Sequence, residues 1–133
     1  MDDAPIFDPA AFRLTEGEAA LAARVREFGR TVLAPRAARW DREASFPTEN
    51  YRDMHEAGLL GLCVPAEDGG LGAGFRAYCL AAAEMGRYCG ATALTWNMHV
   101  CSTLWSGPIS DEMDIPADIR ALGEDAAAET RED

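Results

Sequence analysis

Lysine is absent from the 133-residue sequence, and all twelve basic residues are arginines. A chain without lysine has no side-chain amine for a Schiff base, for the lysine of a P-loop or for a Ser-x-x-Lys nucleophile. The 23 acidic residues outnumber the basic ones, and the formal net charge is therefore −11. A charge of this sign repels nucleic acids and anionic membranes, so we expect neither as a partner.

Long apolar runs are missing as well. The longest stretch without a charged residue, 88–110, contains many hydroxyl residues together with Asn97, His99 and Pro108. This stretch is too polar for a membrane span, and a buried helix fits it better. The first residues, "MDDAPIFDPAAF", have no basic segment before an apolar one and do not form a signal peptide. We therefore expect a cytoplasmic protein.

The four cysteines form no C-x-x-C motif. Without an export signal, a disulfide framework is not expected. His99 and Cys101 are two residues apart, so on a helix they face different sides. We predict no metal site and interpret the cysteines as small buried thiols.

The hydrophobic periodicity predicts an all-α fold of four to five helices. Thr15 and Glu18 form a capping box, so a helix begins there. Pro35 marks a kink or a boundary in this first helical region. The arginines of 24–42 are interpreted as an outer face of ion pairs.

Three further helices follow from the pattern. "FPTENYRDMHEAG" starts at a proline and ends at Gly58. A second helix begins at Phe75, and its apolar stripe is expected at Phe75, Tyr78, Cys79, Ala82, Met85 and Cys89. The third begins near Thr92, is apolar almost all round as expected for burial on several sides, and is expected to stop at Gly107 and Pro108. We divide the chain into a leader (1–13), a helical domain (14–107) and a weakly helical acidic tail (108–133).

The glycine-rich segment contains "GAGFRA", which formally matches the dinucleotide-binding fingerprint G-x-G-x-x-G/A. That fingerprint needs a preceding strand and an acidic residue about twenty positions later, and the sequence has neither. Two interpretations remain open. The loop is either a compact turn between helices or the mouth of a ligand cleft.

Four polar or aromatic residues share one face of the last predicted helix, at spacings of 0, 3, 4 and 7. They are Thr92, Thr95, Trp96 and His99. Buried polar groups need partners or a ligand. Bonds within the helix or to neighbouring backbone compete here with a role in a ligand pocket.

Three segments resemble the N-terminal helical domain of acyl-CoA dehydrogenases. They are "LTEGEAALAARVREFGRTVLAPRAARWDREASFP", "MHEAGLLGLCVPAEDGGLGAGF" and "AEMGRYCGATALTWNMHVCS", within residues 14–107. The most specific part, "GLLGLCVPAEDGGLG", is similar to the family's Gly-Leu-x-Gly and Pro-Glu-x-Tyr-Gly-Gly-x-Gly turn. Asp68 stands where an aromatic residue is usual in that turn.

The resemblance implies an FAD-dependent enzyme of fatty acid metabolism. Such an enzyme removes the α-proton of an acyl-CoA thioester while the β-hydride passes to the flavin. The family's middle β-domain and C-terminal helical domain, which carry most FAD contacts and the catalytic carboxylate, are not among these 133 residues. We therefore assign no catalytic residue and expect the isolated chain to bind FAD weakly or not at all.

The resemblance also implies a pocket wall. In the family, the helix that matches residues 92–106 lines the acyl-chain cavity near the flavin. This implies that Thr92, Thr95, Trp96 and His99 are pocket residues. It places a pocket-adjacent turn at Asp68, Gly69, Gly70, Leu71 and Gly72.

Two functions remain open. The chain is either part of a truncated or split enzyme that needs the missing domains in trans, or a non-catalytic binding or regulatory module derived from that domain. Both interpretations predict an exposed apolar face on the helix 92–105, which favours self-association or a partner.

Overall fold

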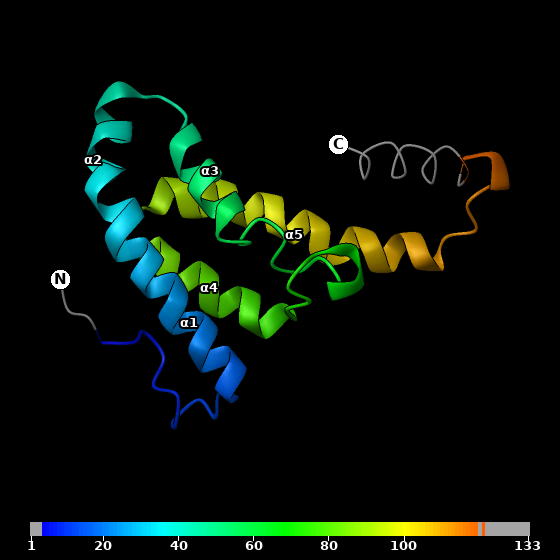
Figure 1. The fold of residues 1–133 in the computed structure, drawn as a ribbon, viewed down its shortest axis with the longest axis horizontal. Coiled ribbons are helices and arrows are strands. Elements are labelled where there is room, and N and C mark those ends of the chain that lie inside the picture. Colours follow the sequence, from blue (N-terminus) through cyan, green and yellow to red (C-terminus); the bar gives the residue numbers. More distant parts are fainter. Residues whose placement is uncertain (1–3, 120, 122–133) are drawn as a thin grey trace.

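The computed structural model describes residues 4–119 and 121, which contain helices and no strand (Figure 1). This part of the chain confirms the all-α prediction. Five α-helices follow one another, with a π-helical turn at Gly29–Leu33 and a 3-10 turn at Ala66–Asp68. The α-helices are α1 (Glu16–Phe28), α2 (Ala34–Glu43), α3 (Thr48–Glu56), α4 (Phe75–Gly86) and α5 (Gly90–Glu112).

The start of α1 confirms the predicted capping box. The Thr15 hydroxyl accepts a hydrogen bond from the Glu18 amide at 3.2 Å, and the Glu18 carboxylate accepts one from the Thr15 amide at 2.8 Å. These two bonds satisfy backbone donors that the first turn of a helix leaves unpaired. The backbone hydrogen bond from Thr15 lowers the pKa of Glu18.

The boundary predicted at Pro35 is a π-helical turn. Residues Gly29–Leu33 adopt this wider turn just before the proline, which lies in the first turn of α2. A Cβ atom at Gly29 would lie 2.2 Å from the ring of Tyr88. The glycine therefore lets the chain that joins α4 and α5 pack directly against the backbone of the first helical region.

Helices α1, α4 and α5 form the centre of the fold. α4 packs against α1 on one side and α5 on the other, and α1 and α4 lie side by side in Figure 1. Buried residues from every α-helix except α2 form one core, which includes Val25, Met54, Met85, Trp96 and Val100, and Ala34 and Ala37 of α2 pack against it half-buried.

The face predicted for α4 is partly wrong. Phe75 and Cys79 were expected to face inward, but both are exposed, and the buried residues are Tyr78, Leu80, Ala81, Glu84 and Met85. Cys79 also departs from the expectation of buried thiols. Glu84 takes an inward position on α4, where Arg26 and Arg87 pair with its carboxylate.

The predicted end of the last helix is wrong too. α5 continues through Gly107 and Pro108 to Glu112, and its C-terminal half extends past the other helices (Figure 1). A proline removes one amide donor, yet the amide of Met113 bonds the carbonyl of Ile109 at 3.0 Å. Helical hydrogen bonding therefore resumes beyond the proline. Residues 122–133 of the predicted tail lie outside the described residues.

Candidate functional site

Two of the four predicted pocket residues are fully buried in the core. Trp96 is 0% exposed, and its indole Nε1 donates to the carbonyl of Leu59 at 3.0 Å. The ring stacks on Tyr78 with centroids 6.0 Å apart. Thr92 is also buried, and its hydroxyl accepts a hydrogen bond from the Asn50 side chain at 3.0 Å. Both side chains thus fasten α5 to the segment that follows α2.

The other two residues lie nearer the surface. His99 is exposed, and its Nε2 lies 3.2 Å from the carbonyl oxygen of Leu60. The half-buried Thr95 donates within α5 to the carbonyl of Thr92 at 3.1 Å. All four predicted pocket residues therefore have hydrogen-bond partners within the chain.

The glycine-rich loop is a closed turn in this structure. The amides of Gly69, Gly70, Leu71 and Gly72 donate to the carbonyls of Ala66, Pro65, Gly61 and Val64. Gly69 and Gly72 have positive φ angles of 85° and 60°, which favour glycine. A Cβ at Gly70 would lie 2.1 Å from the Val64 carbonyl oxygen. The loop's amides are therefore engaged inside the chain and not directed at a phosphate.

An apolar cavity of about 330 Å³ lies beside this loop, between the first turns of α1 and α4. Leu71 is the predicted loop residue that lines it. Its remaining lining is Gly17, Glu18, Leu21, Leu62, Ala73 and Ala77. The cavity contains no residue of α5, so the two predicted site regions do not meet there.

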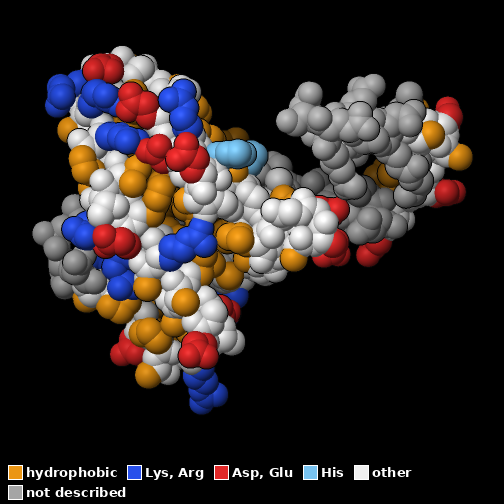
Figure 2. Space-filling model, viewed as in Figure 1, with side chains coloured by type: hydrophobic (Ala, Val, Ile, Leu, Met, Phe, Trp, Pro, Cys, Tyr) orange, Lys and Arg blue, Asp and Glu red, His pale blue; other side chains and the backbone are white. Residues whose placement is uncertain are grey.

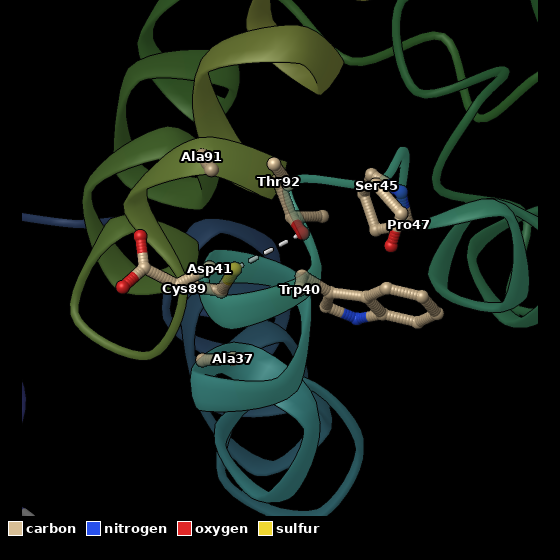
Figure 3. Close-up of a pocket in the computed structure, with 9 residues that line it drawn as sticks. Ala37, Trp40, Asp41, Ser45, Pro47, Cys89, Ala91 and Thr92 are labelled. Atoms are coloured by element: carbon tan, nitrogen blue, oxygen red, sulfur yellow. Dashed lines mark hydrogen bonds between the residues drawn. The ribbon is translucent and has the colours of Figure 1, made fainter.

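A second cavity of about 290 Å³ lies where α2 ends and α5 begins (Figure 3). Thr92 is the predicted site residue that lines it, together with Cys89, Trp40 and Asp41. The Cys89 thiol lies 3.1 Å from the Thr92 hydroxyl and donates to it. The cavity cannot be read from local spacing, because its walls come from segments about fifty residues apart in the chain.

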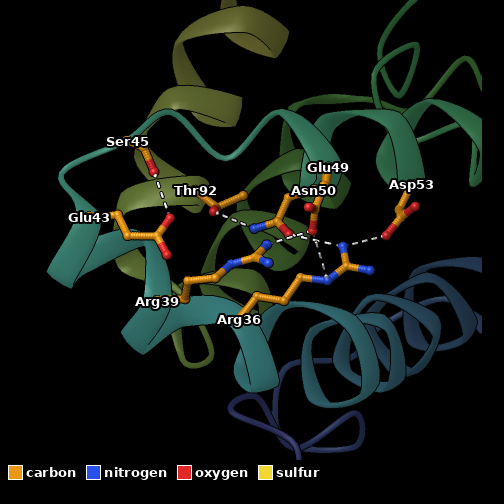
Figure 4. Close-up of polar contacts among 8 residues, drawn as sticks. All are labelled: Arg36, Arg39, Glu43, Ser45, Glu49, Asn50, Asp53 and Thr92. Carbon is orange, nitrogen blue, oxygen red and sulfur yellow. Dashed lines mark hydrogen bonds and ion pairs between the residues drawn. The ribbon is translucent and has the colours of Figure 1, made fainter.

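A polar cluster joins this cavity to α3 (Figure 4). Arg36 donates to Asp53 at 2.6 Å and to the Asn50 carbonyl oxygen at 3.2 Å. Arg39 donates to Glu49 at 2.6 Å. These arginines form ion pairs, as predicted for this face, but their partners are acids of α3. The cluster is structural: Glu49 and Asp53 are paired with arginines, and Glu43 accepts a hydrogen bond from the Ser45 hydroxyl at 3.4 Å.

Glu84 is the most deeply buried charged side chain among the described residues, at 1% exposure. Its carboxylate lies 3.2 Å from an Arg26 nitrogen and 3.3 Å from an Arg87 nitrogen, and it accepts a bond from the Ile6 amide at 3.1 Å. Arg87 also donates to the carbonyl of Ala4 at 2.6 Å. The carboxylate thus ties the leader, α1 and α4 together, a role that satisfies a buried charge.

The outward side of α5 carries large apolar side chains. Leu94, Met98, Trp105 and Ile109 are 62%, 64%, 59% and 52% exposed. We call these four residues the α5 stripe. In Figure 2 the arm formed by α5 is almost free of charged side chains until its end, where acidic residues gather. Exposed apolar side chains that share one side of a helix are a candidate interaction site.

Neither a metal centre nor a membrane span is found in residues 4–119 and 121. No three His, Cys, Asp or Glu side chains come together there as metal ligands. No helix in this part of the chain is both long enough and apolar enough to cross a bilayer. Burial raises the pKa of the Cys63 thiol, so this cysteine is poorly suited to act as a thiolate nucleophile.

The sequence model of the protein family "acyl-CoA dehydrogenase, N-terminal domain" matches residues 15–110 of this chain. The chain belongs to the acyl-CoA dehydrogenase family. It is 35% identical over 89 residues to the probable acyl-CoA dehydrogenase YngJ of Bacillus subtilis, which covers 67% of this chain and 23% of the relative. An acryloyl-CoA reductase (NADH) of Anaerotignum propionicum is 38% identical over the same shares of the two chains.

A mitochondrial short-chain specific acyl-CoA dehydrogenase of the mouse is 42% identical over 84 residues, which cover 63% of this chain and 20% of that protein. The chain thus spans about a fifth of the length of the curated relatives it matches. Their complete activities belong to proteins several times larger than this one.

The described residues do not by themselves fit the flavin that acyl-CoA dehydrogenases use. A dinucleotide needs backbone amides or cations for its pyrophosphate. The loop amides already bond backbone carbonyls. Both cavities are lined mainly by apolar residues, and their charged lining residues, Glu18 and Asp41, would repel a phosphate. No catalytic step through the flavin is therefore derived from this chain.

Proposed function

We propose that the chain serves as the N-terminal helical domain of an FAD-dependent acyl-CoA dehydrogenase and is inactive alone. The complete enzyme would catalyse α,β-dehydrogenation of an acyl-CoA thioester in fatty acid metabolism, in the cytoplasm. Other segments would hold the flavin and supply the catalytic base. The contribution of this chain would be one wall of the acyl pocket.

The α5 stripe is the observation that supports this proposal. A helix of a small folded domain normally buries its large apolar side chains. α5 buries one side through Trp96 and Val100 but leaves Met98 and Trp105 more than half exposed. A surface of this kind is suited to contact an acyl chain and the segments that enclose it.

The predicted pocket residues take two roles in this proposal. Trp96 and Thr92 hold α5 in place from behind, through their bonds to Leu59 and Asn50. Thr95 and His99 lie at the edge of the exposed side and are candidates for direct contact with a substrate. The turn Asp68–Gly72 would support the helix arrangement and not bind phosphate.

The first experiment is a visible spectrum of the chain purified from its own cells with any protein that copurifies. A flavin spectrum together with a larger partner would support an enzyme completed in trans. A colourless chain of 14.4 kDa without a partner would contradict that assembly.

The pocket role has its own test in a complete relative. The residue at the position of Met98 is replaced by alanine, and kcat/KM is measured for a series of acyl-CoA chain lengths. We expect the preference to shift toward longer chains by about tenfold, since each methylene in an apolar pocket is worth about 1–3 kcal/mol. An unchanged chain-length preference would contradict the proposal that α5 lines the acyl pocket.

A non-catalytic helical module is the alternative. The closed glycine loop favours it, because the loop's amides are already bonded inside the chain. This alternative predicts a stable partner without flavin, and the same purification distinguishes it from the enzyme.

A further inference from the structure

We propose that two copies of this chain pair through the α5 stripe as antiparallel helices related by a two-fold axis. This inference goes beyond the proposed function, since it concerns the contact of this chain with a second copy of itself. Three observations carry it: the spacing of the stripe, the distribution of charge along α5 and the position of α5 in the fold.

The spacing of the stripe is the same in both directions along the helix. Leu94, Met98, Trp105 and Ile109 are separated by four, seven and four residues. Steps of four and seven return to nearly the same side of a helix, so the four form one seam. An antiparallel copy therefore places Leu94 opposite the partner's Ile109 and Met98 opposite the partner's Trp105. A two-fold contact requires this kind of self-complementary surface.

The side chains at the centre of the seam are small enough for two helices to approach each other closely. The two-fold axis would pass between Cys101 and Ser102, midway along the stripe. Neighbouring packed helices lie about 8–10 Å apart, depending on the side chains at the contact. Small residues at the axis allow the larger pairs on either side to interlock.

The charge distribution selects both the surface and the direction of pairing. Each chain carries a formal charge of −11, but no Asp, Glu, Lys or Arg lies between Gly90 and Ser110. Two copies can therefore meet along this segment without bringing like charges together. Glu112 lies in the last turn of α5, where it opposes the helix dipole.

Antiparallel pairing improves the position of Glu112. In the proposed register, this carboxylate lies beside the start of the partner's α5. That helix start has no side-chain cap and no acidic residue in its first turn, so its free amide groups favour a nearby anion. A parallel pair would instead place the two Glu112 carboxylates together, which is unfavourable.

The position of α5 leaves room for a second copy. Its C-terminal half extends beyond α1, α3 and α4 and carries Trp105 and Ile109. The N-terminal half of the partner's α5 would lie along this extension, and its C-terminal half would lie beside Leu94 and Met98, which are exposed. Any domain that covered the stripe in a complete enzyme would compete with this pairing.

Sedimentation equilibrium of the purified chain tests the pairing. We expect the unmodified chain to form a dimer, and Met98→Glu to weaken the association by at least about tenfold, because each dimer would bury two unpaired carboxylates. Phe46→Glu is the matched control, since Phe46 is 57% exposed but lies outside α5. Circular dichroism checks that each variant is folded.

A cross-linking experiment tests the direction. Leu94→Cys and Ile109→Cys chains are prepared with Cys63, Cys79 and Cys101 replaced by serine, and treated with a short bismaleimide. The buried Cys89 is kept, and the chain with the three serines alone is the blank. The antiparallel register predicts cross-links when the two variants are mixed and few with either alone. Cross-links with either variant alone would overturn the antiparallel register. A monomer at the highest soluble concentration, or equal weakening by Phe46→Glu, would overturn the pairing itself.

Discussion

The substitution Trp96→Ala tests whether this side chain fastens α5 to the core. Trp96 is fully buried, stacks on Tyr78 and donates a 3.0 Å hydrogen bond to Leu59. Truncation of a buried tryptophan costs about 3–5 kcal/mol. A domain of this kind has a free energy of unfolding of about 5–15 kcal/mol. We therefore expect a large fall in stability, and a chain of low initial stability would unfold.

Trp96→Phe separates packing from hydrogen bonding. Phenylalanine keeps most of the aromatic volume but leaves the carbonyl of Leu59 without the indole donor. A buried polar group that loses its partner costs about 1–3 kcal/mol. The phenylalanine variant should therefore fall between the unmodified chain and Trp96→Ala.

The assay is urea denaturation followed by far-ultraviolet circular dichroism. Phe46→Ala serves as the control, because Phe46 is exposed and contacts Tyr51 at its edge, with ring centroids 5.1 Å apart. The loss of unfolding free energy in Phe46→Ala should stay below about 1.5 kcal/mol. Equal losses for Trp96→Ala and Phe46→Ala would refute the structural role, and retention of full stability by Trp96→Phe would refute the contribution of the hydrogen bond.

Three further predictions concern other parts of the fold. Gly70→Ala should destabilise the chain by about 1–3 kcal/mol, because the added methyl group meets the Val64 backbone. Gly17→Ala should stabilise α1 by about 0.5–1 kcal/mol, because no atom lies within 4 Å of the added methyl group. Thermal unfolding measures both changes in stability. Glu84→Gln should lower the free energy of unfolding by about 3–5 kcal/mol, because it breaks the buried ion pairs with Arg26 and Arg87. Limited proteolysis should then cleave the leader sooner than in the unmodified chain, because the leader is bonded to Glu84 through Ile6. The pKa of Glu18 is lowered in the folded state, so its contribution is present at neutral pH and is lost as the pH falls through the folded pKa. Glu18→Gln should flatten this acid limb of the stability curve, and an unchanged limb would contradict the assignment.

Local signals in the sequence determined the class of the fold and several helix ends. The capping box at Thr15 and Glu18 and the left-handed Gly58 act within a few residues of each other, so their effect can be read from spacing alone. The family is also recognisable from the order of short segments, and the matched range of residues 15–110 confirms it.

Only the tertiary structure decided which side of each helix is buried. Glu84 faces inward because arginines from α1 and from the end of α4 meet it there, a coincidence that no periodicity records. Likewise, the side chains of Thr92 and Trp96 form hydrogen bonds with Asn50 and Leu59, which lie 42 and 37 residues away in the chain. Their shared helical face was visible in the sequence, but their partners were not. A side chain's role depends on groups brought together by packing, and these distances are set by the whole fold.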